Sequence, residues 1–387
     1  MEYAQRNLDV GWPNFIAQQL SLNGMPQFAL ASLLNSPFEA HHKQLQRRFK
    51  SPKLQAMLSF QDLYVGLTPY SAPAVFSLLQ AIELNEGVYY PVGGFHKVAK
   101  GLLTICRELG VKFKFNSAVD EILVGGKIYA YELQGGELLQ SDVIVANADL
   151  PYVELNLLPE QFRRKGLGDA EYSSGVVAFY WGCDRQWPQL AHHTVFLSTD
   201  YAGSWDRVFK QQRMGSGGFN FYCAAASRTD PSVCPEGHDA IMVLVPCPLL
   251  PPTPEGGDSR TQAGGRDWDA EVAQWMETAR KGVLQQFEEA AGMAGFADSI
   301  RAELVYTPRD WQQRYSLERG AAFGLAHSLN QLAIFRPSPR HPNVDDLYFV
   351  GASTRPGNGL PLVLTGARLV ADDVVARRPD LFARDQQ

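Results

Sequence analysis

The sequence predicts an α/β protein in which an incomplete dinucleotide-binding (Rossmann-like) domain is joined to a mixed α+β domain. Two observations predict this fold. Between residues 93 and 146 a helix leads into short alternating runs and a buried strand, which is the order of the second half of a dinucleotide-binding domain. From residue 347 onward a strand, a glycine-rich loop and a helix follow one another, a unit suited to binding a ligand.

Composition and short motifs exclude several classes of protein. The chain has 387 residues, 45% hydrophobic and 20% charged, so it can bury a sizeable core and we expect two or three domains. Its 35 basic and 41 acidic residues give a net charge of -6, without the basic excess of a nucleic-acid-binding protein. Five cysteines at scattered spacings form no CxxC pair, which predicts reduced thiols and no metal site. No P-loop, HExxH, GxSxG or GxGxxG motif occurs.

The N-terminal part combines an uncharged stretch with a basic one. No charged side chain occurs from Val10 to Phe38, and a run rich in His, Lys and Arg follows as far as Lys53. Apolar anchors beside cations are typical of a protein on an anionic membrane surface, but packed helices with a solvated basic edge would give the same pattern. We expect neither a signal peptide nor a membrane-spanning helix, because the first ten residues lack an apolar core and no apolar run is long enough.

The clearest helix begins at Gly93-Gly94 and ends at Gly110. Apolar side chains from Phe95 to Leu109 recur at i, i+3, i+4 and i+7, and a glycine at the C′ position is a common helix stop. Short alternating runs follow, and paired glycines between some of them predict hairpin turns. These runs are Val111–Phe115, Val119–Val124, Lys127–Leu133 and Val143–Ala146.

The middle of the chain predicts a second set of strands and one long helix. A Pro/Gly-rich stretch over residues 248–265 is expected to be an exposed loop. From Asp267 to Met293 the apolar side chains lie near a 3.6-residue period, which predicts a helix. The predicted strands are Gly175–Cys183, Thr194–Ser198, Phe219–Ala225, Ala240–Val245 and Ile300–Tyr306.

The C-terminal strand Leu347–Val350 leads through a glycine loop into a helix opened by Pro361. Glycines let a backbone approach a ligand without interference from a Cβ atom. Free N–H groups at a helix start favour the oxygens of a phosphate, a ribityl chain or a flavin carbonyl. An ordinary Gly/Pro-rich turn would have the same spacing. The loop Tyr90–Gly94 enters its helix in the same way, and the same two interpretations apply.

Two further groups could carry chemistry. Asp149 follows the strand that ends at Ala146, and it is either a carboxylate beside a cofactor or the N-cap of the helix opened by Pro151. His192 and His193 are adjacent on a predicted strand. We therefore expect their side chains to point to opposite faces and not to bind one metal ion together.

Many collinear segments resemble the carotenoid desaturases of the bacterial and fungal phytoene desaturase type, nearest to the fungal branch. Each segment is longer than a short motif, and together they extend over nearly the whole chain. The resemblance is carried by LYVGLTPYSAPAVFSLLQ, GVYYPVGGFHKVAKGL, VIVANADLPY, QLAHHTVFL, DPSVCPEGHDAIMVLVP and RGAAFGLAHSLNQLAIFRPSPRHPNVDDLYFVGASTRPGNGLPLVLTGARL.

This resemblance implies an FAD-dependent oxidoreductase that desaturates a long, uncharged polyene such as phytoene in carotenoid biosynthesis. In that family the flavin takes a hydride from a saturated C–C unit while a proton leaves the neighbouring carbon, and the protein supplies orientation and a dry apolar slot. A membrane-dissolved substrate implies a peripheral position on a membrane and favours the membrane-surface interpretation of the N-terminal part. The aromatic residues that would line a tunnel, or form an ordinary core, include Phe179, Tyr180, Trp181 and Phe221.

The family's C-terminal FAD segment and its inner glycine loop can be carried over residue by residue. They fall on Gly351, Thr354, Pro356, Gly357, Gly359, Pro361, Gly93 and Gly94. Asp149 matches the family's NAD tripeptide, and Arg355 stands where the family usually has His. Asp149 and Arg355 are therefore candidates to which the resemblance assigns no acid or base role. We expect the loops of Gly94 and Gly357 to form the inner wall of one flavin pocket beside an apolar channel.

The family begins with a βαβ unit that carries the glycine fingerprint and an acidic residue for the ADP-ribose, and this chain is expected to start after that unit. Three functions stay open: a desaturase that needs the missing unit, a noncatalytic membrane-associated remnant that binds an apolar ligand, and a retinol-saturase-like or amine-oxidase-like flavoenzyme. The sequence indicates neither an oligomeric state nor a compartment. The predicted parts are residues 1–79 (helical, facing substrate or membrane), 80–150 (incomplete FAD-binding part), 151–339 (substrate domain) and 340–387 (C-terminal FAD-binding segment).

Overall fold

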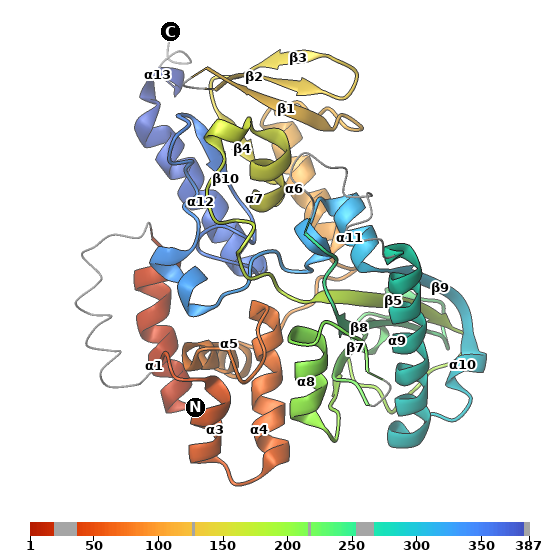
Figure 1. Ribbon diagram of the computed structural model, residues 1–387. Helices are drawn as coiled ribbons and strands as arrows, with labels where there is room; N and C mark the ends of the chain where they lie inside the picture. Colours follow the sequence, from red (N-terminus) through yellow and green to blue (C-terminus); the bar gives the residue numbers. More distant parts are fainter. Residues whose placement is uncertain (19–36, 126–127, 216–217, 253–266, 383–387) are drawn as a thin grey trace.

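The computed structural model describes residues 1–18, 37–125, 128–215, 218–252 and 267–382. Figure 1 shows three groups of elements: N-terminal helices, a part with a two-stranded and a three-stranded sheet, and a part built on a larger sheet. Most of the predicted loop at 248–265 lies outside the described residues.

The N-terminal helices pack on one another. Ala4 and Leu8 of the first helix are buried against Leu78 and Ala81 of the helix over residues 78–86. Part of the basic stretch is neutralised, since Lys43 and Arg47 both pair with Glu39. The described residues include no helix long and apolar enough to cross a membrane, and residues 19–36 of the predicted membrane-facing stretch are not described. The helices are α1 (Glu2–Gly11), α3 (His41–Arg48), α4 (Pro52–Ser59) and α5 (Leu78–Glu86).

The predicted helix and meander form, but one predicted strand does not. Helix α6 (His96–Glu108) is followed by an antiparallel sheet with the order β1-β2-β3. The prediction of a strand at Val111–Phe115 is wrong. These residues are exposed and unpaired among the described strands, and Phe113 stacks on Phe115. The strands are β1 (Val119–Val124), β2 (Ile128–Leu133) and β3 (Leu138–Gln140).

Two short strands from distant parts of the chain pair in parallel. They are β4 (Ile144–Ala146) and β10 (Leu347–Phe349). Parallel strands are normally buried on both faces in larger sheets. Here β10 is buried, whereas Val145 of β4 is 47% exposed. No described strand pairs with the outer edge of β4.

The larger sheet has five antiparallel strands in the order β6-β7-β8-β5-β9. Helix α9 (Trp268–Ala291) covers one face of it, as Figure 1 shows. Phe179, Trp181 and Phe221 are buried in that core, so a tunnel-lining role for these three is excluded. Tyr180 lies on the opposite face and is only partly buried. The strands are β5 (Gly175–Cys183), β6 (His193–Phe196), β7 (Phe221–Ala225), β8 (Asp239–Cys247) and β9 (Ile300–Tyr306).

A second core joins the small sheets to the C-terminal segment. Ile122 of β1 and Leu347 of β10 are buried in it together with Leu325. This core fixes the segment around residue 325 against the strand that leads into the glycine loop. The remaining helices are α7 (Leu150–Tyr152), α8 (Tyr201–Phe209), α10 (Phe296–Ser299), α11 (Pro308–Tyr315), α12 (Leu360–Arg377) and α13 (Pro379–Phe382).

Candidate active site

The glycine loop between β10 and α12 has the predicted geometry. Gly351, Gly357 and Gly359 have φ angles of 114°, 140° and 100°, which side chains other than glycine rarely adopt. Pro361 lies in the first turn of α12, and no side chain caps the helix start. Gly359 and Pro361 are exposed, so the first N–H groups of α12 are open to a ligand.

His327 contacts this loop at Gly357 and Asn358. A Cβ atom at Gly357 would lie 2.4 Å from His327 Nε2, so only glycine fits there. Burial and the nearby Arg336 lower the pKa of His327 well below its usual value, so the ring is neutral. Its Nδ1 lies 3.2 Å from the carbonyl oxygen of Val65, and the Asn358 N–H donates to Nε2 at 3.4 Å. His327 was not predicted from the sequence, because nothing in its local pattern marks a buried anchor.

Arg336 connects the glycine loop to the preceding segment. Its guanidinium is buried, and each of its hydrogen bonds to a described residue is donated to a backbone carbonyl. Burial lowers the pKa of Arg336 to about 9, and Asp149 acts in the opposite direction. Thr354 uses its hydroxyl to donate to Pro337 O, so this predicted cofactor residue is bonded within the protein. The carbonyls that Arg336 binds belong to Leu325, Ala326, Gln331, Ala352 and Thr354.

Asp149 lies at the loop and does not cap a helix with its side chain. It is at the N-cap position of α7, but its Oδ1 accepts a hydrogen bond of 2.5 Å from Ser353 Oγ. Because β4 and β10 are parallel, their carboxyl ends meet at one edge and bring these residues together. Asp149 Oδ2 is buried without a described partner. Burial raises the pKa of Asp149 to about 6, opposed mainly by the Ser353 hydrogen bond.

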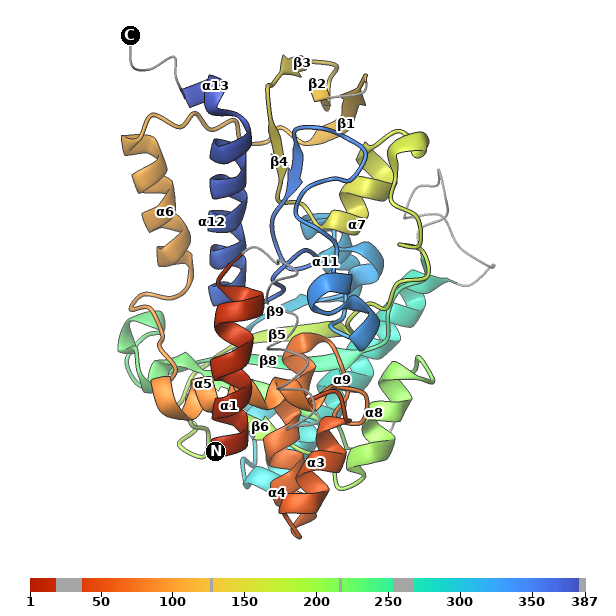
Figure 2. The same ribbon diagram turned by 90° about the vertical axis from the view of Figure 1, so that its left-hand side faces the viewer.

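The other predicted glycine loop is not brought into contact with the first. The Gly93 N–H donates to Asp230 Oδ2 at 2.5 Å, and the nearest group to a Cβ atom on Gly94 is the Tyr90 hydroxyl. Figure 2 shows α6 and α12 standing apart, with both N-terminal ends toward the same side of the molecule. Neither cavity described below includes both Gly94 and Gly357. The expected shared pocket therefore stays a prediction.

Apolar side chains line the uncovered face of the five-stranded sheet. Cross-strand pairing places Val195, Tyr222 and Leu244 in one row and Met242, Tyr180 and Leu304 in the next. Most of them are partly exposed, and Leu304 is 51% exposed. This face is the reverse of the one that α9 covers. It is covered in part, because Tyr222 packs against Phe60, Leu63 and Trp205. Val195 and Leu304 are its most exposed named residues, and a hydrocarbon could bury such apolar surface without a polar handle.

Tyr64 connects this apolar face to the glycine loop. Asn358 donates through its side-chain amide to the Tyr64 carbonyl. Burial raises the pKa of the Tyr222 hydroxyl, and Tyr64 acts in the same direction.

The histidine pair differs from its prediction. The rings of His192 and His193 stack 4.2 Å apart, because His192 precedes the start of β6 and is not held in the strand pattern. Each ring binds a different hydroxyl, His192 that of Thr229 and His193 that of Tyr222. Among the described residues no cluster of His, Cys, Asp and Glu could hold a metal ion.

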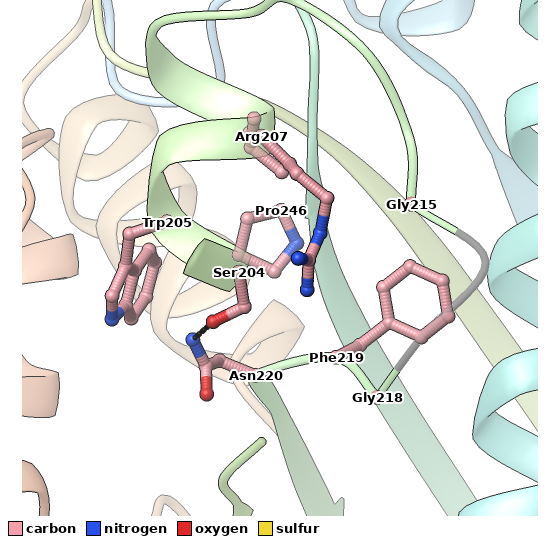
Figure 3. A pocket seen from close by; sticks show the side chains of 9 residues that line it. Ser204, Trp205, Arg207, Gly215, Gly218, Phe219, Asn220 and Pro246 are labelled. Carbon is pink, nitrogen blue, oxygen red and sulfur yellow. Dashed lines mark hydrogen bonds between the residues drawn. The ribbon is translucent and has the colours of Figure 1, made fainter. Parts of the chain in front are cut away.

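Two cavities lie elsewhere. One, drawn in Figure 3, lies between α8, the segment that leads into β7, and Pro246 of β8, beside the hydrogen bond from Asn220 to Ser204. Its volume of about 10 Å³ leaves room for no more than a water molecule. The second, of about 290 Å³, includes Arg355 and Pro356 in its wall. In the described part of the chain no hydrogen bond or ion pair joins the Arg355 guanidinium to a carboxylate.

The chain is similar to known flavoproteins over most of its length. It matches the family model for flavin containing amine oxidoreductases over residues 25–375. A phytoene desaturase of Fusarium fujikuroi is 36% identical over 350 residues, which cover 88% of this chain and 60% of that relative. An all-trans-zeta-carotene desaturase of Myxococcus xanthus is 30% identical over 383 residues, covering 96% and 69%. The chain thus spans 60% of the length of the Fusarium relative.

Solved structures confirm the mixed α/β fold. A putrescine oxidase variant superposes with a TM-score of 0.61 at 9% identity, covering 97% of this chain and 73% of that one. An oxidoreductase from Methanosarcina mazei superposes with a TM-score of 0.60 at 16% identity, covering 91% and 73%. At these identities the likeness concerns the fold alone.

Proposed function

Because this chain belongs to the flavin containing amine oxidoreductase family and is a homologue of the phytoene desaturases, we propose that it takes part in the FAD-dependent desaturation of a long apolar polyene such as phytoene. The observation that carries the proposal is the apolar face of the five-stranded sheet beside the glycine loop. A hydrocarbon can be recognised only by burial of its surface, at about 25 cal/mol per Å². Two neighbouring rows of side chains, with Tyr222 and Leu244 in one and Tyr180 in the next, suit that task.

The glycine loop fits the isoalloxazine end of a flavin. Gly351, Gly357 and Gly359 keep the backbone accessible, and the uncapped start of α12 offers N–H groups to a ring carbonyl. When bound, FAD supplies the hydride acceptor for desaturation. The residues of the chain position the loop: Asp149 holds Ser353, whose hydroxyl oxygen in turn accepts the Leu325 N–H at 3.0 Å. We assign Asp149 a positioning role.

The adenosine end of FAD needs further structure. The β4–β10 pair has an unpaired outer edge among the described strands, and no residue of α6 is buried although the helix has an apolar face. Leu102, Ile105 and Leu109 are each about half exposed or more. We propose that a βαβ unit of the kind that begins the family's fold packs between α6 and β4, and that turnover requires it.

An amine-oxidase-like activity is less well supported. An amine substrate is a cation, and its recognition needs a carboxylate or a cage of aromatic rings. The sheet face opposite α9 carries tyrosine rings and aliphatic side chains with His193 at its edge, and its described cross-strand rows contain no carboxylate. The incomplete parallel sheet instead supports the noncatalytic alternative, in which the chain binds an apolar ligand at a membrane surface without bound FAD.

Turnover distinguishes these functions. The purified chain is incubated with FAD and phytoene in liposomes, alone and with a separately expressed βαβ unit, and the products are separated by chromatography. New conjugated double bonds only in the presence of the unit support the proposed desaturase. Polyene binding without flavin binding under both conditions supports the noncatalytic alternative. Flotation of the chain with the liposomes tests the peripheral membrane position.

A further inference from the structure

A cavity lies on the outer side of the glycine loop, away from the start of α12. Its volume of about 290 Å³ is at the lower end of the range for small-molecule sites. Arg355 and Pro356 of the loop form one wall, and Leu369 to Arg377 of α12 form another. The other lining residues come from the N-terminal part and from the segment around β10: Phe15, Gln18, Ser338, Pro339, Arg340 and Tyr348.

The cavity carries an excess of positive charge. Three arginines line it, against one acidic side chain, Asp373. Arg377 is neutralised by Asp373 at 2.9 Å. Arg340 uses one terminal nitrogen to bind Asp345, which is itself mostly exposed and lies outside the lining. Arg355 has no ion pair among the described residues.

Two guanidinium nitrogens at this cavity are buried without a partner. They are Nε of Arg340 and Nε of Arg355, and no described group accepts a hydrogen bond from either. A buried donor left unpaired costs about 1–3 kcal/mol, and more when it is charged. Burial and the neighbouring Arg164 also lower the pKa of Arg355, which indicates that its charge is not compensated within the protein. Both Nε atoms are covered by protein, so a ligand in the cavity would meet the terminal nitrogens of these guanidinium groups. Arg355 brings a positive charge there that no described ion pair compensates.

We propose that this cavity binds a phosphate group, whose oxygens accept hydrogen bonds from Arg355 and Arg340. The planar fork of arginine matches phosphate oxygens, and charge-assisted bonds of this kind are the strong ones. Phe15, Pro356 and Leu369 provide an apolar wall for the carbon part of a phosphate ester. The group comes either from a free phosphorylated metabolite or from the headgroup of an anionic phospholipid.

The phosphate site shares Arg355 and Pro356 with the glycine loop but lies apart from the open N–H groups at the start of α12. It includes α12 as far as Arg377, whereas the open N–H groups are at Gly359 to Pro361. At 1.5 Å per residue, Asp373 lies about 18 Å along the helix from Pro361. Gly357 lies against His327 and Arg355 lines the cavity, so the two faces of one loop would hold different groups.

Thermal unfolding of the full chain with inorganic phosphate tests the proposal. We expect phosphate to raise the midpoint of the wild type, and Arg355→Gln and Arg340→Gln to weaken binding about 10- to 100-fold, the factor expected for one charge-assisted hydrogen bond. Arg301→Gln is the control variant. Arg301 is an exposed arginine of β9 that pairs with Asp184, and this variant is expected to bind phosphate like the wild type. Without phosphate, Arg355→Gln is expected to unfold at the same temperature as the wild type or higher, because an uncompensated charge is removed.

Further arms distinguish the sources. Flotation with vesicles of phosphatidylcholine, with and without phosphatidic acid, is compared with binding of free phosphate. Saturable binding of free phosphate identifies a metabolite site, and arginine-dependent flotation only on phosphatidic acid identifies a headgroup site. The proposal is overturned if phosphate and acidic vesicles act equally on the wild type and Arg355→Gln, or if neither binds. Displacement of bound phosphate by FAD would also overturn it, because the site would then belong to the flavin.

Discussion

Replacing Gly357 by alanine tests the close contact between the glycine loop and His327. The backbone at Gly357 has a φ of 140°, and a Cβ atom there would lie 2.4 Å from His327 Nε2. The backbone conformation costs about 1–3 kcal/mol for a residue other than glycine. Insertion of a methyl group into a packed site adds about 1–3 kcal/mol. We therefore expect Gly357→Ala to lower the free energy of unfolding by about 2–6 kcal/mol.

Gly359 provides the matched control. Its φ of 100° is also unfavourable for alanine, but no atom lies within 4 Å of a Cβ placed there. Gly359→Ala should therefore cost only the backbone part, about 1–3 kcal/mol. Urea denaturation measures both values, and Gly357→Ala combined with His327→Ala should recover the steric part in a double-mutant cycle. Equal losses for the two glycine variants, with no coupling to His327, would refute the reasoning.

Three further predictions concern the same region. Burial raises the pKa of Asp149 from its ordinary value to about 6, so the native state binds this proton more tightly than the unfolded state does. The free energy of unfolding therefore falls as pH rises from about 4 to 6. In pH-dependent denaturation, Asp149→Asn should abolish that slope and stabilise the protein at pH 7 by up to about 3 kcal/mol. Arg336→Met leaves several buried carbonyls without a donor and should lower the free energy of unfolding by about 3 kcal/mol or more, whereas a loss below about 1 kcal/mol would contradict its anchoring role. Leu304→Asn on the open sheet face should change the free energy of unfolding by less than about 0.5 kcal/mol, because Leu304 is half exposed. It should weaken polyene binding about tenfold in a fluorescence-quenching titration. Unchanged affinity would show that the polyene binds elsewhere.

Elements defined by local pattern were predicted well from the sequence. The alternation of Gly175–Cys183 and the period of the helix after Asp267 depend only on neighbouring residues, and both elements form close to their predicted bounds. The glycine loop was also predictable, because its positive φ angles require glycine wherever they occur.

Features that depend on distant partners were not predictable. Val111–Phe115 alternates like a strand, but a strand needs a neighbour to pair with, and the described chain offers none. Asp149 has the position of an N-cap, yet its side chain binds Ser353, which is 204 residues away in the sequence. The sequence of β5 does not show which face of the sheet α9 covers, so it could not decide whether Phe179 lines a tunnel or packs in the core under α9.

Photo-crosslinking with a polyene that carries a photoreactive group tests the central claim most directly. If the uncovered sheet face next to the glycine loop receives the hydrocarbon, mass spectrometry should find adducts on Tyr180, Tyr222 or Leu244. The exposed apolar residues of α6, such as Ile105, give the internal comparison. Adducts confined to α6 and absent from the sheet face would contradict the account.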